Sequence, residues 1–155
     1  MSLFGKVEAE IEIKASAYKF YEVNSKRVAE APKFCPNFIQ SVDLVEGEWG
    51  QEGCVVCCYF IFDGKAVMSK EVMEAIDDKN HSVTFKVIGG ILMELYKSFK
   101  FVVQATPKGE GSLVRWTLEY EKLNVDDPES NTMLEFAIGV TKDIDTHLTQ
   151  CVCVK

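Results

Sequence analysis

Long apolar runs and clusters of basic residues are both missing from this sequence. A membrane-spanning helix needs about 20 consecutive apolar residues, and no stretch of the chain approaches that length. Lysine and arginine total 17 against 24 acidic residues, and the formal net charge is −7. Because nucleic-acid binding depends on basic residues that neutralise phosphates, we expect neither a nucleic-acid partner nor a membrane span.

The N-terminus also lacks the features of a secretory signal. Residues 1–6 contain no long apolar segment followed by a cleavage site of small residues. The expected compartment is therefore the cytoplasm, where thiols stay reduced. We accordingly expect free thiols, and we interpret the glycosylation-like triplet at residues 80–82 as chance. The six cysteines are Cys35, Cys54, Cys57, Cys58, Cys151 and Cys153.

The cysteine and histidine spacing does not predict a metal site. Cys54 and Cys57 have the separation of a zinc or redox motif, but residues three apart on a strand point to opposite faces. No second pair of Cys or His follows nearby to complete four ligands. His81 and His147 are each flanked by polar residues. We therefore expect no metal and no histidine-based catalysis.

A glycine-rich loop at residues 46–53 raises the question of nucleotide binding. A phosphate-binding loop needs a lysine and a helix directly behind it. Here three glutamates would repel phosphate, no lysine follows, and the next segment has the pattern of a strand. The loop is therefore interpreted as a hairpin turn, and no cofactor is expected.

Strict alternation of apolar and polar residues dominates the chain and predicts β-strands. It is clearest at residues 3–14, where Val7, Ala9 and Ile11 alternate with charged residues. Ser16 is positioned to cap a short helix, and a second short helix is expected at residues 25–31. Asp63-Gly64 is the strongest hairpin signal. The expected strands cover residues 3–14, 38–45, 54–62, 65–76, 81–88, 92–106 and 112–123.

The last long segment, residues 128–148, has helical periodicity. Its small and apolar residues recur at the spacing of one helical face, namely at Met133, Ala137, Val140, Thr141, Ile144 and Leu148. Short turns between six consecutive strands favour an antiparallel meander. The expected fold is α+β, a single domain over residues 1–155 with a curved seven-stranded sheet around this helix and a frayed tail at residues 151–155. The inner face has more large apolar residues than one helix needs to cover, which indicates a cavity; a completely filled core, typical of an interaction protein, is the alternative.

Six stretches closely resemble the major latex protein branch of the pathogenesis-related class 10 superfamily. They lie in the same order as in that family and cover nearly the whole chain: VEGEWG (45–50), DGK (63–65), MELYKSFK (93–100), TPKGEGSLVRW (106–116), LEYEK (118–122) and VTKDIDTHL (140–148). The resemblance implies a helix-grip fold with a large apolar cavity. It also implies a role in plant defence or specialised metabolism, with sterols, terpenoids, flavonoids or alkaloids as ligands. Some relatives are enzymes without a cofactor, so a cyclase or isomerase that uses the same cavity is the alternative function.

The sequence departs from the family pattern at four places, one of which is the tail at residues 151–155. Cys58 stands where the family usually has an aromatic residue, and Phe62 where it often has a histidine. Adjacent histidines that are common in the short helical segment are absent around residues 28–30. We expect the other changes to enlarge the pocket and make it more apolar.

The expected ligand is a hydrophobic small molecule, and the expected state is a monomer or weak dimer. Tyr120 is the best candidate for a polar or catalytic group, followed by a carboxylate such as Glu71 or Glu94 if it points inward. The residues expected to line the pocket are Val56, Cys58, Phe60, Val83, Phe85, Phe99, Phe101, Val103, Leu118 and Tyr120 from the sheet, and Phe136, Ala137, Val140 and Ile144 from the helix.

Overall fold

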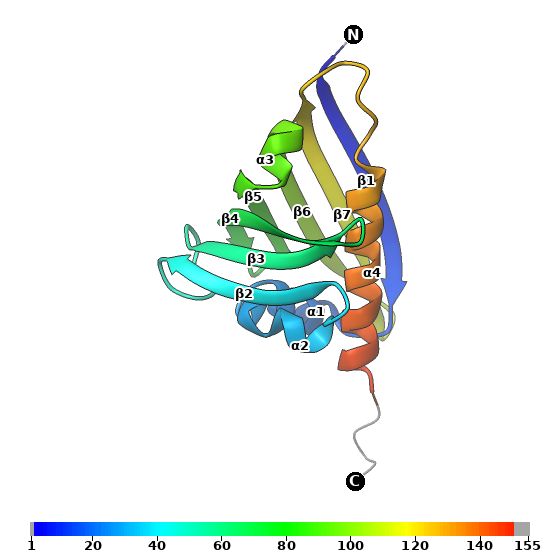
Figure 1. The fold of residues 1–155 in the computed structure, drawn as a ribbon. Helices are drawn as coiled ribbons and strands as arrows, with labels where there is room; N and C mark the ends of the chain where they lie inside the picture. The colour runs from blue at the N-terminus through cyan, green and yellow to red at the C-terminus, as the bar shows by residue number, and fades with distance from the viewer. Residues whose placement is uncertain (1, 151–155) are drawn as a thin grey trace.

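The computed structural model describes residues 2–150, in which a seven-stranded antiparallel sheet curves around a C-terminal helix (Figure 1). The strand order β1-β7-β6-β5-β4-β3-β2 makes β2 to β7 a continuous meander, with β1 added at the β7 edge. This confirms the fold class expected from the alternation. The strands are β1 (Phe4–Ile13), β2 (Ile39–Glu46), β3 (Val55–Phe62), β4 (Lys65–Asp77), β5 (Ser82–Gly90), β6 (Tyr96–Lys108) and β7 (Gly111–Lys122).

The helices occupy the concave side and one end of the sheet (Figure 1). They are α1 (Ala17–Asn24), the 3₁₀ turn η1 (Val28–Glu30), α2 (Ala31–Phe34), α3 (Leu92–Leu95) and α4 (Asn131–Leu148). Ser16 caps α1 as expected, since its Oγ accepts a hydrogen bond from Lys19 N at 3.2 Å. The buried residues of α4 are five of the six predicted from its periodicity: Met133, Ala137, Val140, Thr141 and Ile144.

Two contacts fix α4 against the sheet. Asp145 Oδ1 accepts a 2.8 Å hydrogen bond from Ala15 N in the turn between β1 and α1. Trp116 Nε1 on β7 donates a 2.7 Å hydrogen bond to Thr141 Oγ1. The C-terminal half of α4 is thereby held over β1 and β7, beside the short helices.

Three boundaries differ from the sequence-based expectation. Residues 92–95 form helix α3, because the chain leaves β5 at Gly90, whose φ of +92° only glycine adopts freely. The expected helix at 25–31 is instead η1 followed by α2, with Pro32 in the first turn of α2, where its missing N–H costs no hydrogen bond. Helix α4 begins at residue 131 and not at 128. The Asp63-Gly64 hairpin is confirmed, with φ values of +54° and +75°.

Within residues 2–150, no helix is both long enough and apolar enough to span a membrane. The expected frayed tail, including Cys151 and Cys153, lies outside the described residues.

Candidate functional site

A cavity lies between the sheet, α4 and the group of short helices formed by α1, η1 and α2. The cavity has a volume of about 90 Å³ and is open on one side. This volume is smaller than the roughly 150 Å³ apolar cavity that holds benzene. A larger ligand must therefore extend into the mouth or displace side chains. The lining residues are Val23, Asn24, Val28, Ala31, Ile39, Val42, Val56, Cys58, Glu71, Phe85, Phe101, Trp116, Phe136, Ala137, Val140 and Ile144.

The apolar walls follow from the periodicity of each element. Alternate residues of a strand share a face, so Val56 and Cys58 on β3 both point inward. Phe85 and Phe101 lie opposite each other in the β5–β6 register and form the floor of the cavity. On α4, the spacing of Ala137, Val140 and Ile144 places these side chains on the face that looks toward the sheet.

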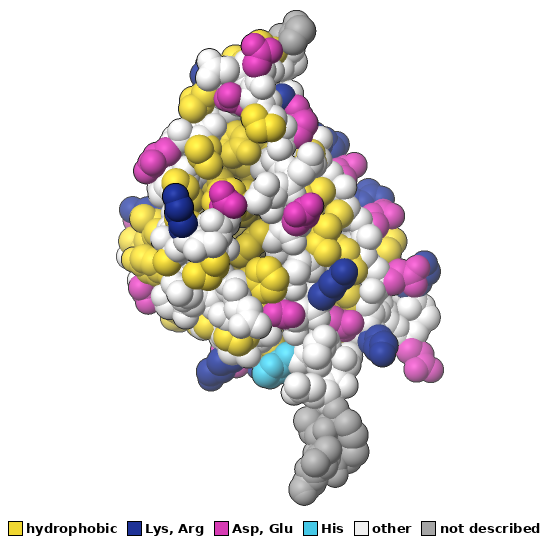
Figure 2. All heavy atoms as spheres, turned by 45° about the vertical axis from the view of Figure 1, so that its right-hand side comes forward, with side chains coloured by type: hydrophobic (Ala, Val, Ile, Leu, Met, Phe, Trp, Pro, Cys, Tyr) yellow, Lys and Arg dark blue, Asp and Glu magenta, His cyan; other side chains and the backbone are white. Residues whose placement is uncertain are grey.

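Aromatic rings pack around Phe136, which lines the cavity. The ring of Phe136 on α4 lies 5.6 Å from that of Phe38 and 5.2 Å from that of Phe60, measured between centroids. Gly139 makes this approach possible, because a Cβ at that position would lie 2.4 Å from the Phe38 ring. The face shown in the space-filling view carries hydrophobic side chains, with acidic side chains among and around them (Figure 2).

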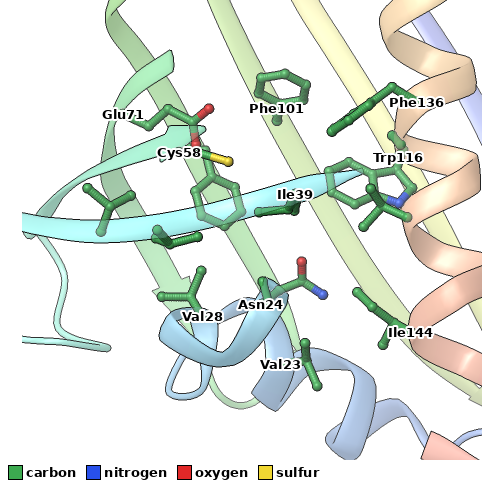
Figure 3. A pocket seen from close by; sticks show the side chains of 16 residues that line it. Val23, Asn24, Val28, Ile39, Cys58, Glu71, Phe101, Trp116, Phe136 and Ile144 are labelled. Atoms are coloured by element: carbon green, nitrogen blue, oxygen red, sulfur yellow. The ribbon is translucent and has the colours of Figure 1, made fainter. Parts of the chain in front are cut away.

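Glu71 is the one residue with a charged side chain among those that line the cavity. It projects from β4 between Val56 of β3 and Val87 of β5, its partners in the sheet register. Burial raises the pKa of its carboxyl to about 7, and the nearby Ser69 hydroxyl opposes this only in part. Figure 3 shows the carboxyl group at the edge of the cavity, next to the sulfur of Cys58. Glu71 can thus exchange a proton near neutral pH inside an apolar space.

Few other polar atoms reach the cavity. Asn24 Nδ2 donates to Phe20 O at 3.1 Å, and Figure 3 shows its amide group directed toward the cavity. The Trp116 indole N–H is already bonded to Thr141. Burial raises the pKa of the Cys58 thiol well above its ordinary value, so the thiol stays protonated at neutral pH. The arrangement offers a ligand an apolar enclosure, one acid and one amide.

The structure brings together eight of the fourteen residues expected to line the pocket. Those that line the cavity are Val56, Cys58, Phe85, Phe101, Phe136, Ala137, Val140 and Ile144, whereas Phe60, Val83, Phe99, Val103, Leu118 and Tyr120 lie outside its wall. These six are buried too, but they pack against other side chains of the core. Phe99 and Tyr120, for example, stack on each other with centroids 5.6 Å apart. The expectation treated the whole inner face as one surface, but this cavity lies at the end near the short helices.

The two other polar candidates also lie away from the cavity. The Tyr120 hydroxyl donates to Glu129 Oε1 and accepts from Ser130 N at 3.1 Å, just before α4. Its pKa is raised to about 12, mainly by burial. Glu94 is exposed on α3. Of the three polar groups considered from sequence, only Glu71 faces the cavity.

Sequence reasoning missed part of the wall. The short helices and β2 contribute Val23, Asn24, Val28, Ala31, Ile39 and Val42, none of which was expected there. Only tertiary packing turns these segments toward the cavity. Trp116 was also not predicted to line the cavity. The alternation along β7 could have identified it, because it shares the inner face of the strand with Leu118 and Tyr120.

Cys35 and Cys54 are buried in the core, and the two histidines pack against aromatic rings. Cys54 Sγ lies 3.3 Å from Met73 Sδ in the core, and burial raises the pKa of Cys35 to about 12. The rings of His81 and His147 pack against Tyr21 and Phe34, with centroids 5.5 and 4.7 Å apart. Among residues 2–150, no cluster of three or more acidic, His or Cys side chains is arranged to hold a metal ion.

Comparison with known proteins gives a consistent family assignment. The model of the pathogenesis-related protein Bet v 1 family matches residues 2–151. The chain is 44% identical to MLP-like protein 43 of Arabidopsis thaliana over 149 residues, which covers 95% of this chain and 94% of that protein. It is 46% identical to MLP-like protein 34 of the same plant but spans only 46% of its length.

Solved structures show the same fold. Major latex-like protein 151 from Panax ginseng superposes with a TM-score of 0.92 at 41% identity, over 95% of this chain and 99% of that one. Norcoclaurine synthase from Thalictrum flavum, in complex with dopamine and hydroxybenzaldehyde, superposes with a TM-score of 0.70 at 18% identity, over 91% of this chain and 86% of that one. At that identity the second likeness concerns the fold alone.

Proposed function

This chain belongs to the pathogenesis-related Bet v 1 family, and from that premise we propose that its cavity binds and carries hydrophobic small molecules. The observation that supports the proposal is the apolar hollow itself, which is bounded by ten different helices and strands. Apolar burial contributes about 25 cal/mol per Å² of surface removed from water, before the cost of immobilising the ligand. A plant sterol, terpenoid, flavonoid or alkaloid could gain enough from such a cavity to bind at micromolar concentration.

The open cavity favours this function over a purely structural or interaction role. A filled core would have left no continuous space between α4 and the sheet. As further parts of the proposal, we expect the protein to act in the cytoplasm as a monomer or weak dimer, in plant defence or specialised metabolism.

Extraction followed by titration tests the proposal. The purified protein is extracted with organic solvent and the extract analysed by mass spectrometry, and the emptied protein is then titrated with representative sterols, terpenoids and flavonoids. We expect at least one ligand with micromolar affinity. A clean extract together with no binding across the panel would refute the carrier function.

A second candidate function is supported by Glu71. A carboxyl group that titrates near neutral pH inside an apolar enclosure has the pKa that a general acid or base needs. A cofactor-free cyclase or isomerase would use the walls to hold a reactive substrate in one conformation and Glu71 to move a proton. The hydroxyl of Tyr120 is already hydrogen-bonded to Glu129 and Ser130. In this alternative Glu71 is therefore the group that transfers the proton.

Product analysis separates the two functions. A reactive substrate is incubated without protein, with the unaltered protein, and with the Glu71→Gln and Tyr120→Phe variants. A carrier leaves the product profile unchanged in all four samples. An enzyme changes the profile, and Glu71→Gln abolishes the change.

A further inference from the structure

We propose that the cavity selects hydrophobic molecules that carry one basic nitrogen, with the Glu71 carboxylate as the ion-pair partner of the protonated amine. The inference rests on the proposed binding function and specifies the chemical class of the ligand. It starts from an unusual combination, a carboxyl group aimed into an apolar cavity without a cationic side chain to balance it.

The surroundings of Glu71 leave its charge uncompensated. Its neighbours across the sheet are Val56 and Val87, with exposed fractions of 2% and 3%. The nearest protein donor is Ser69, whose buried hydroxyl makes no hydrogen bond of good geometry. No Lys, Arg or His side chain among the described residues acts on the Glu71 carboxyl. Glu71 is partly buried, and a carboxylate beside an apolar cavity without a cationic partner is unfavourable. A ligand that brings a positive charge would remove this cost.

The elements that face Glu71 supply no competing charge. The short helices contribute Asn24 and Val28, β3 contributes the protonated thiol of Cys58, and α4 contributes Phe136. The cavity therefore contains one negative charge in its ionised state, within a protein of net charge −7. An anionic ligand would add repulsion, and an uncharged one would leave the carboxylate without a counter-charge.

The aromatic wall also favours a cation. Four aromatic side chains line the cavity, and the negative face of an aromatic ring attracts an ammonium group. The rings are those of Phe85, Phe101, Trp116 and Phe136. The rest of the wall is almost entirely aliphatic, so a second charged group on the ligand would find no partner. One nitrogen on an apolar body therefore fits better than a polyamine or a zwitterion.

The proposal predicts a proton linkage. An ammonium group next to Glu71 lowers the carboxyl pKa, so amine binding releases a proton when Glu71 is partly protonated in the free protein. The amine keeps its own proton, since alkylammonium groups titrate near pH 10. Amine affinity should accordingly rise from pH 5.5 to pH 8, whereas the affinity for a matched alcohol should not change.

Three ligands that differ only in their head group test the proposal. Decylamine, 1-decanol and decanoate are each used to displace the uncharged fluorescent dye N-phenyl-1-naphthylamine from the protein at pH 8. Decylamine should bind at least about tenfold more tightly than decanol, which corresponds to about 1.4 kcal/mol. In Glu71→Gln this ratio should fall to about three or less, and decanoate should bind more tightly than it does to the unaltered protein. Glu94→Gln makes the same chemical change outside the cavity and should behave as the unaltered protein does.

The possible results separate selectivity for amines from the proposed binding of hydrophobic molecules in general. Equal affinities for amine and alcohol, with the dye bound, would overturn the amine selectivity and leave the apolar cavity intact. An amine preference that persists in Glu71→Gln would also overturn it, because the cation would then be held elsewhere. Absence of binding for the dye and all three ligands would overturn the proposed function, and the inference with it. Retained dye binding by Glu71→Gln shows that the variant is folded.

Discussion

The indole nitrogen of Trp116 and the hydroxyl of Thr141 join the sheet to α4 through a 2.7 Å hydrogen bond. Thr141 Oγ1 in turn donates to Ala137 O at 2.8 Å, so the helix backbone completes the chain of hydrogen bonds. Trp116 and Ala137 both line the cavity. This contact therefore sets the distance between the sheet and the helix at the place where the cavity is built.

Thr141→Val should destabilise the protein by about 1–3 kcal/mol, because it keeps the shape of the side chain but leaves the buried indole N–H without an acceptor. For a chain of this size each kcal/mol lowers Tm by about 2–4 °C. Thermal unfolding measures the change. Thr146→Val, at an exposed position of the same helix, is the control and should shift Tm little. Equal effects of the two substitutions would contradict the importance of the Trp116 contact.

Cys58→Phe should reduce the affinity for N-phenyl-1-naphthylamine by about tenfold or more, because an aromatic ring at this position would fill much of the cavity. Fluorescence titration measures the affinity. Cys57→Phe introduces the same ring on the opposite face of β3 and serves as the control. If Cys58→Phe bound the dye as well as Cys57→Phe does, the dye would be binding outside this cavity.

Glu71→Gln should make the protein more stable at pH 8 but not at pH 4. The pKa of Glu71 is about 7 in the folded protein and near 4.3 in an unfolded chain, so the folded state holds the proton more tightly. Stability falls as pH rises through this range, and the full cost is present only near pH 8 and above, on the order of 4 kcal/mol at most.

Urea unfolding of both proteins from pH 4 to pH 8 measures this cost. The difference in free energy of unfolding should grow through that range and level off near pH 8. Glu94→Gln should show no such growth. A constant difference at every pH would mean that Glu71 titrates normally.

Tyr120→Phe should lower stability by about 1–2 kcal/mol and leave ligand affinity unchanged. The substitution removes the hydrogen bonds that join the Tyr120 hydroxyl to Glu129 and Ser130, directly before α4. Chemical unfolding and dye titration of the same preparation provide the two measurements. Lower affinity with unchanged stability would place Tyr120 in the binding site and contradict the position described for it.

Local sequence patterns were enough to predict the strands, their meander and the buried face of α4. Each depends on a local periodicity that packing did not override, such as the alternation from Phe4 to Ile13. The Asp63-Gly64 hairpin is equally local, since its backbone needs positive φ at both residues. Helix α3 was not predictable in this way, because residues 92–95 are as apolar as a strand and form a helix only where the chain leaves the sheet after Gly90.

The location of the cavity depends on long-range packing, which local patterns do not reveal. Alternation shows which face of a strand is inward, but it cannot show whether an inward side chain meets another side chain or a cavity. Phe99 and Phe101 lie on the same face of β6, yet Phe101 lines the cavity and Phe99 stacks on Tyr120. The position of Glu71 was decided in the same way. Its burial depends on β3, β5 and the short helices together, and such long-range packing leaves no pattern in the neighbouring sequence.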